Sequence, residues 1–263
     1  MKIFALWAQG EPQAPDQIRR IFDRWRDLNP QHELVIYDGP MMDAELVNSR
    51  IDTSQLAVQA KSDILRVKLL AEQGGCWVDA SLLPVVALDS WLPSLMNPAG
   101  FFSFRQCGYD RLIGSWFLAS EINNPIVVAW FESITQYMSK PRKLVNHKNL
   151  FWRLRNQGDY LNRVREEKGG RTNYYPYFWM HYLFEIAVTQ NPELAKLWEK
   201  VPVWPVLPTH ALQHARFHNK MTTSDFDAAL PRMLRVAPVQ KLDWRKAWSD
   251  SVFQDIDPET VIL

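Results

Sequence analysis

Three side chains between residues 61 and 83 have types and a spacing suited to binding a phosphorylated sugar. Asp63 and Arg66 are three residues apart in a run with helical periodicity, so both project from one face of a helix. A carboxylate accepts hydrogen bonds from hydroxyls, and a guanidinium donates a fork to phosphate oxygens. Asp79 is the strongest single candidate for a site residue. The alternative for Asp63 and Arg66 is a solvated ion pair, which is common on helices.

A helix followed by a buried strand must position these residues. An apolar stripe at three- and four-residue spacing predicts the helix, with Ser62 as its N-cap and Gly74-Gly75 ending it without a Cβ clash. Cys76-Trp77-Val78 is short and apolar, and Asp79-Ala80-Ser81 follows as a polar break. Ligands of open α/β sheets lie beyond the carboxyl ends of the strands. Asp79 is therefore expected at the mouth of a crevice.

The chain begins with a strand, a helix and a strand over residues 3–7, 15–28 and 34–37, which predicts a βαβ unit with a parallel strand pair. Further strands are expected at 100–104 and 111–120. An apolar fraction of 47% supplies a core for one domain over all 263 residues. The predicted fold is α/β, a mixed and mostly parallel sheet flanked by helices, with a helical, aromatic-rich C-terminal half.

The motif S-D-x-x-R, the apolar helix and G-G-C-W-V-D-A-S together resemble the sugar-binding block of glycosyltransferase family 32 and of the related bacterial capsular polysaccharide synthesis proteins. The resemblance implies a GT-A (Rossmann-like) fold, a UDP- or GDP-sugar donor, a divalent cation (Mn²⁺ or Mg²⁺) and retention of configuration. It implies that Asp63 and Arg66 hold the donor sugar and phosphate, and that Asp79 is the first acid of a D-x-D metal motif. Ser81 replaces the last acid, and its neutral hydroxyl is a weaker ligand for a hard cation.

Two further segments resemble the same family. In those enzymes the end of the first strand borders the nucleobase, so Trp7 and Gln9 are expected to contact the base; packing in the core is the equal alternative for Trp7. The segment S-W-F-L-A-S resembles the part of the family that follows the sugar-binding block, so Ser115 and Trp116 are expected to line the donor or acceptor pocket; core packing is the alternative for Trp116.

The C-terminal half carries two more segments of this kind. His181 lies in an aromatic run and is expected to bind substrate hydroxyls or phosphate, with a buried, hydrogen-bonded histidine as the alternative. In the segment 241–244, Lys241 is expected to meet a phosphate and Trp244 to cap the cleft. The histidines at 210, 214 and 218 are expected in a winding loop after a proline-rich stretch, with no metal role.

Residues 140–171 combine basic side chains with interleaved aromatic and leucine residues. This pattern suits peripheral contact with an anionic membrane surface, a lipid-linked acceptor or a polyanionic glycan, whereas a solvated helical face is the slightly favoured alternative. A nucleic-acid partner is not expected, because the formal net charge is +1 and no binding motif is present.

Two cysteines make neither a disulfide framework nor a metal cluster, and the apolar start is shorter than a membrane span of about 20 residues. The expected location is the cytoplasm, with the inner face of the cytoplasmic membrane as a peripheral site.

The predicted activity is that of a hexosyltransferase that moves a sugar from a nucleotide-diphosphate sugar to a glycan or lipid-linked glycan in surface polysaccharide synthesis. No carboxylate stands out as a nucleophile, so retention by front-face attack is preferred. The competing hypothesis is a non-catalytic nucleotide-sugar or glycan-binding protein, which Ser81 in place of an acid motivates.

Overall fold

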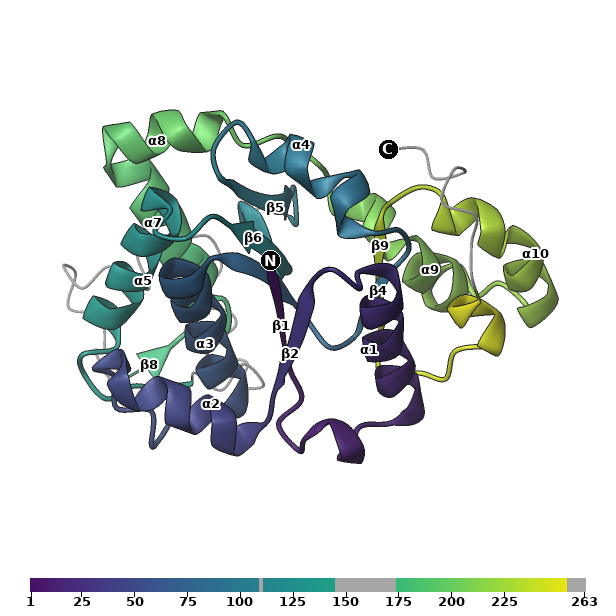
Figure 1. The fold of residues 1–263 in the computed structure, drawn as a ribbon, viewed down its shortest axis with the longest axis horizontal. Helices are drawn as coiled ribbons and strands as arrows, with labels where there is room; N and C mark the ends of the chain where they lie inside the picture. Colours follow the sequence, from purple (N-terminus) through teal and green to yellow (C-terminus); the bar gives the residue numbers. More distant parts are fainter. Residues whose placement is uncertain (109–110, 145–173, 255–263) are drawn as a thin grey trace, which may run out of the picture.

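The computed structural model describes residues 1–108, 111–144 and 174–254. A five-stranded sheet runs through the molecule, with helices on both faces (Figure 1). In pairing order its strands are β2 (Glu33–Tyr37), β1 (Lys2–Leu6), β3 (Gly75–Val78), β6 (Ile113–Ser120) and β5 (Phe101–Arg105).

The mixed α/β class is confirmed, and so is the N-terminal βαβ unit, because β1 pairs parallel with both β2 and β3. β6 runs antiparallel to β3 and to β5. β2, β1, β3 and β5 therefore run in one direction and β6 runs against them, so the expected mixed, mostly parallel sheet is confirmed. β5 and β6 are joined by a short connection, which antiparallel strands permit and parallel strands do not.

Alternating side chains of the strands build one core on each face of the sheet. On β1, Phe4 enters one cluster, whereas Ile3 and Ala5 enter the other. The first cluster contains residues of α2 (Gly39–Leu46), α3 (Val58–Gln73), α5 (Pro125–Tyr137), α7 (Trp179–Gln190) and α8 (Pro192–Glu199). The second contains residues of α1 (Asp16–Leu28), α4 (Leu92–Met96), α9 (Ala211–Gln213) and α10 (Thr223–Leu234).

The helix that carries the predicted site begins earlier than its sequence suggests. α3 starts at Val58 after the N-cap Ala57, so the prediction of Ser62 as N-cap is wrong. Ser62 lies inside the helix, where its hydroxyl accepts a hydrogen bond from Arg66 (3.2 Å). The predicted end is confirmed, since Gly74 follows the helix with a φ of 64°.

A second, two-stranded sheet brings the C-terminal part of the chain to the end of β3. β4 (Leu82–Pro84) and β9 (Val239–Lys241) pair antiparallel, with Leu82 opposite Lys241. The backbone N–H of Leu242 donates to the carbonyl of Ser81 (2.9 Å), which extends the ladder. Lys241 is thereby fixed next to residues 79–81. A third pair, β7 (Lys143–Leu144) and β8 (Tyr174–Tyr175), is parallel.

The histidine-containing segment is helical, so the prediction of a winding loop is wrong. Pro208 lies in the first turn of a 3-10 helix, where its missing N–H has no intrahelical partner to lose. The rings of His214 and His218 stack with centroids 4.8 Å apart. The short helical turns of the fold are η1 (Glu11–Gln13), η2 (Val47–Ser49), η3 (Leu88–Ser90), η6 (Leu207–His210), the π-helical η7 (His214–His218) and η8 (Asp250–Phe253).

The turn between α3 and β3 generates a prediction about stability. Gly75 has a φ of 101°, and a Cβ at this position would lie 2.5 Å from the carbonyl oxygen of Lys2. Both the backbone strain and the clash with main chain oppose a side chain, so Gly75→Ala is expected to lower the free energy of unfolding by about 2 to 4 kcal/mol. Urea denaturation followed by tryptophan fluorescence measures this loss.

Gly10 provides the matched control, because its φ of 84° is similar but the nearest heavy atom to a Cβ there is 3.8 Å away. Gly10→Ala carries the strain without the clash and is expected to cost about 1 kcal/mol. Equal losses in the two variants would contradict the role given to the close approach at Gly75.

Candidate functional site

A cavity of about 1460 Å³ lies where β1 and β3 end. Its walls come from the main sheet, from α3 and α7, and from the segment that follows β9. All of the residues that the sequence singled out for the site line it: Trp7, Gln9, Asp63, Arg66, Asp79, Ser81, Ser115, Trp116, His181, Lys241 and Trp244. Pockets for one small molecule usually measure about 300 to 1,000 Å³, so this cavity has room for two ligand groups.

Asp79 stands directly after β3, and three of its groups are held by neighbours. Its backbone N–H donates to the carbonyl of Trp116 (2.9 Å). One carboxylate oxygen, Oδ1, accepts from the indole of Trp77 (3.2 Å), and Oδ2 accepts from the Lys241 ammonium (3.1 Å). The side chain is 29% exposed. Asp79 is thus an oriented carboxylate that still faces the cavity.

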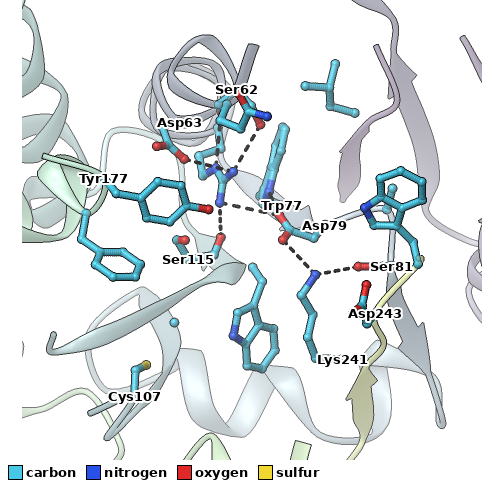
Figure 2. Close-up of a pocket in the computed structure, with 18 of the residues that line it drawn as sticks. Ser62, Asp63, Trp77, Asp79, Ser81, Cys107, Ser115, Tyr177, Lys241 and Asp243 are labelled. Carbon is cyan, nitrogen blue, oxygen red and sulfur yellow. Dashed lines mark hydrogen bonds and ion pairs between the residues drawn. The ribbon is translucent and has the colours of Figure 1, made fainter. Parts of the chain in front are cut away.

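Arg66 is buried, and the protein already engages each nitrogen of its guanidinium. It donates to the carbonyl and the hydroxyl of Ser62 (3.3 and 3.2 Å) and to the carbonyl of Ser115 (2.7 Å). It also forms ion pairs with Asp63 (3.2 Å) and Asp79 (3.6 Å) while its side chain is only 8% exposed (Figure 2). Its contact with phosphate stays a prediction. The observed role of Arg66 is to hold two carboxylates in place.

The two carboxylates have opposite pKa shifts. Burial raises the pKa of Asp63 to about 6, although the neighbouring Arg66 opposes the rise. Burial also disfavours the charge on Asp79, but Lys241 and Arg66 together overcome it and hold the pKa of Asp79 below its ordinary value. Asp79 is therefore ionised at neutral pH, whereas Asp63 gains its proton in mildly acidic solution.

Lys241 lies between the two residues expected to bind a metal. Its ammonium donates to the hydroxyl of Ser81 (2.6 Å) and to the carboxylate of Asp79 (3.1 Å) (Figure 2). In nucleotide sites a hard divalent cation such as Mg²⁺ is usually held by one or two carboxylates, and water and substrate phosphates complete its oxygen ligands. Within the described ranges no group of three His, Cys, Asp or Glu residues is placed to hold a metal. The two oxygens expected to bind Mn²⁺ or Mg²⁺ thus already accept from an ammonium, which such an ion would have to displace.

Two tryptophans from opposite ends of the chain meet at one end of the cavity. The rings of Trp7 and Trp244 are 5.5 Å apart and nearly perpendicular. Trp7 packs partly against the second core cluster, while Trp244 is 43% exposed. The buried Nε1 of Trp7 has no hydrogen-bond partner among the described residues. Trp7 thus contacts the core and also lines the cavity beside the exposed Gln9, and its contact with a nucleobase stays a prediction.

His181 lies on the α7 side of the cavity with 9% of its surface exposed. Burial, together with the charges of Arg111 and Arg66, lowers the pKa of His181 to about 3. The ring is therefore neutral at physiological pH. Its Nδ1 is buried without a hydrogen-bond partner in the part of the chain that the structure describes. The predicted alternative of a hydrogen-bonded core histidine does not account for this nitrogen.

Several cavity residues escaped the sequence interpretation. The sequence indicated only that Trp77 is part of a strand. In the structure its indole donates to Asp79, and its ring lies 5.0 Å from the Arg66 guanidinium. Arg111 and Asp243 also line the cavity. For Asp243 a signal was present, because it stands next to Trp244 in the segment that resembles the family. Arg111 offered no local signal, since an arginine before a strand is common.

The basic segment 140–171 lies largely outside the described residues, so its predicted contact with a membrane or acceptor stays a prediction. In the described ranges, none of the helices combines the length and the apolar character that crossing a bilayer demands.

The family of capsular polysaccharide synthesis proteins matches residues 1–151, more than half of the chain, including β3 and Asp79. This chain belongs to the capsular polysaccharide synthesis protein family. The resemblance noted in the sequence is thereby confirmed. The family match ends before α7, so His181, Lys241 and Trp244 lie beyond it.

A solved structure named PaToxG Glycosyltransferase is similar to this chain with a TM-score of 0.45 and 14% sequence identity, over 91% of this chain and 87% of that one. Among curated proteins, none matches the sequence at a significant level.

The unusual pKa of Asp63 generates a prediction about pH. A carboxyl whose pKa is raised on folding binds its proton more tightly in the folded protein, so its ionisation destabilises the fold as pH rises from about 4 to above 6. Asp63→Asn removes the titrating carboxyl and with it this pH-dependent contribution to the free energy of unfolding. The free energy of unfolding of the wild type, measured relative to that of the variant, is expected to fall by about 2 kcal/mol between pH 4 and pH 7.

Urea denaturation of both proteins across this range gives the difference at each pH. A difference that stays constant, or that rises with pH, would contradict the raised pKa of Asp63.

Proposed function

We propose that this protein is a glycosyltransferase that moves a sugar from a nucleotide-diphosphate sugar to a glycan or lipid-linked glycan during polysaccharide synthesis. The observation that carries the proposal is Asp79, an oriented carboxylate at the end of β3, with a cation on each side and a cavity in front. The family match over residues 1–151 supports polysaccharide synthesis as the setting.

The charges of the site suit the charges that develop in sugar transfer. Breaking the bond between the anomeric carbon and phosphate leaves negative charge on the departing diphosphate and positive charge on the sugar. The Lys241 ammonium faces the cavity and can donate to the leaving phosphate, while the carboxylates of Asp79 and Asp63 accept from sugar hydroxyls and favour the cationic sugar.

The tryptophan pair offers a place for the nucleobase. Aromatic rings stack on bases with a free energy of about 1 to 3 kcal/mol per base. Trp244 presents an exposed ring at 5.5 Å from Trp7, and both tryptophans line the cavity. In this arrangement Gln9 and the two tryptophans bind the base, and Lys241 lies between the base and the sugar.

The contacts of the two carboxylates support retention of configuration over a double displacement. A carboxylate that acts as nucleophile needs free lone pairs directed at the anomeric carbon. Asp79 is bonded to Lys241 and Trp77, and Asp63 is paired with Arg66, so both are weakened as nucleophiles. These contacts support front-face attack, in which the leaving phosphate accepts the proton of the acceptor hydroxyl, with retention of configuration.

A non-catalytic nucleotide-sugar-binding protein is the second candidate. The observation in its favour is the pair Asp79 and Ser81, which supplies a single carboxylate and already binds the Lys241 ammonium. Turnover of the donor separates the two functions.

Donor turnover is expected to depend on Asp79. The purified protein is incubated with a panel of UDP- and GDP-sugars, with Mn²⁺ and with chelator, and the released nucleoside diphosphate is measured. One donor is expected to be hydrolysed slowly, and Asp79→Asn is expected to lower the rate by about 100-fold or more, because the variant keeps the shape of the side chain and loses its charge.

Asp89→Asn is the matched control, since Asp89 is an aspartate that pairs with His32 and Gln31 away from the cavity. Its rate should equal that of the wild type. Binding of a donor without any release would favour the binding protein, and neither binding nor release would contradict both functions.

A further inference from the structure

We propose that the ammonium of Lys241 is the cation that binds the donor diphosphate, so that donor binding needs no divalent metal. This inference rests on the proposed function and specifies how the same site recognises its ligand. It assigns Lys241 the position between Asp79 and Ser81 that a metal ion would otherwise occupy.

The position of Lys241 is set by the backbone and is not that of a free surface lysine. Lys241 pairs with Leu82 in the β4–β9 ladder, and the carbonyl of Lys241 accepts a hydrogen bond from the side chain of Gln213 (2.7 Å). The next residue donates its N–H to the carbonyl of Ser81 (2.9 Å). Only 18% of the Lys241 side chain is exposed. The backbone therefore holds the Lys241 ammonium at one position in the cavity wall, next to Asp79 and Ser81.

The two side chains that accept from this ammonium carry one negative charge between them. Asp79 contributes that charge and Ser81 contributes none, so a monovalent cation neutralises the pair, and the Asp243 carboxylate also lines the cavity beside them (Figure 2). A metal bound by the same two oxygens would also have to displace the lysine, because both oxygens already accept from it.

The geometry leaves one donor for the ligand. An ammonium has three N–H groups. Two are directed at Asp79 and Ser81, and the third has no partner among the described residues. Since Lys241 lines the cavity, this group points to a diphosphate oxygen as its partner. Asp79 and Ser81 then act through Lys241 as positioning residues.

Calorimetric titration of the full-length protein with UDP and with GDP tests the proposal. The nucleotide that binds is expected to show the same Kd, within about threefold, in chelator and in Mn²⁺. Lys241→Met keeps the length of the side chain and removes its charge, and it is expected to weaken binding by about tenfold or more. Lys241→Arg, which keeps the charge, is expected to recover part of that loss.

Lys246→Met is the matched control, because Lys246 lies five residues along the same segment with its ammonium over the ring of Phe217, and it does not line the cavity. It should bind as the wild type does. The wild-type comparison of chelator with Mn²⁺ needs no variant, so the proposal is tested even where Lys241→Met fails to fold.

The outcomes separate this inference from the proposed function. Binding that appears only with Mn²⁺, or that Lys241→Met leaves unchanged, would overturn the inference and leave a nucleotide-sugar enzyme standing. Absence of binding by both nucleotides, with and without Mn²⁺, would overturn the proposed function and the inference together.

Discussion

The site depends on one interaction, the ion pairing of the buried Arg66 guanidinium with carboxylates on either side of it. Charges alternate from Asp63 to Arg66, to Asp79 and to Lys241, with ion-pair distances of 3.2, 3.6 and 3.1 Å. A buried charge without a partner is costly, so each member of this row requires the next. The row ties α3, β3 and β9 together at the point where the sheet opens into the cavity, and it gives the carboxylates their directions.

This arrangement explains why two similar side chains behave differently. Asp79 has a cation on each side and is ionised, whereas burial and the neighbouring charge of Asp79 outweigh the effects of Arg66 and of a hydrogen bond with Trp179 at Asp63, which takes up a proton at mildly acidic pH. One carboxylate with a fixed charge, and one whose charge responds to its surroundings, is an arrangement found where charge develops during a reaction. The cavity thus has the ionised Asp79 near its centre, the rings of Trp7 and Trp244 at one end, and the neutral ring of His181 in its wall.

Local patterns in the sequence predicted what depends on neighbours along the chain. The double glycine ended α3, the apolar triplet formed β3, and Asp79 followed at the mouth of the cavity, because turn chemistry and periodicity act over a few residues. The start of α3 was missed, since Ser62 resembles a cap but its hydroxyl serves Arg66 inside the helix. The burial of Arg66 was also missed, because the sequence does not show the partners that allow a charged side chain to be buried. The pairing of Lys241 with Asp79 spans 162 residues and depends on the β4–β9 ladder, which no local pattern shows.

The central claim is that this cavity binds a nucleotide-diphosphate sugar, and a crystal structure of the protein with such a donor tests it most directly. We expect the base beside Trp7 and Trp244 and a diphosphate oxygen about 3 Å from the Lys241 Nζ, within hydrogen-bond distance. The sugar should then lie against Asp79 and Asp63. A donor bound elsewhere on the molecule, with the cavity empty, would contradict the account.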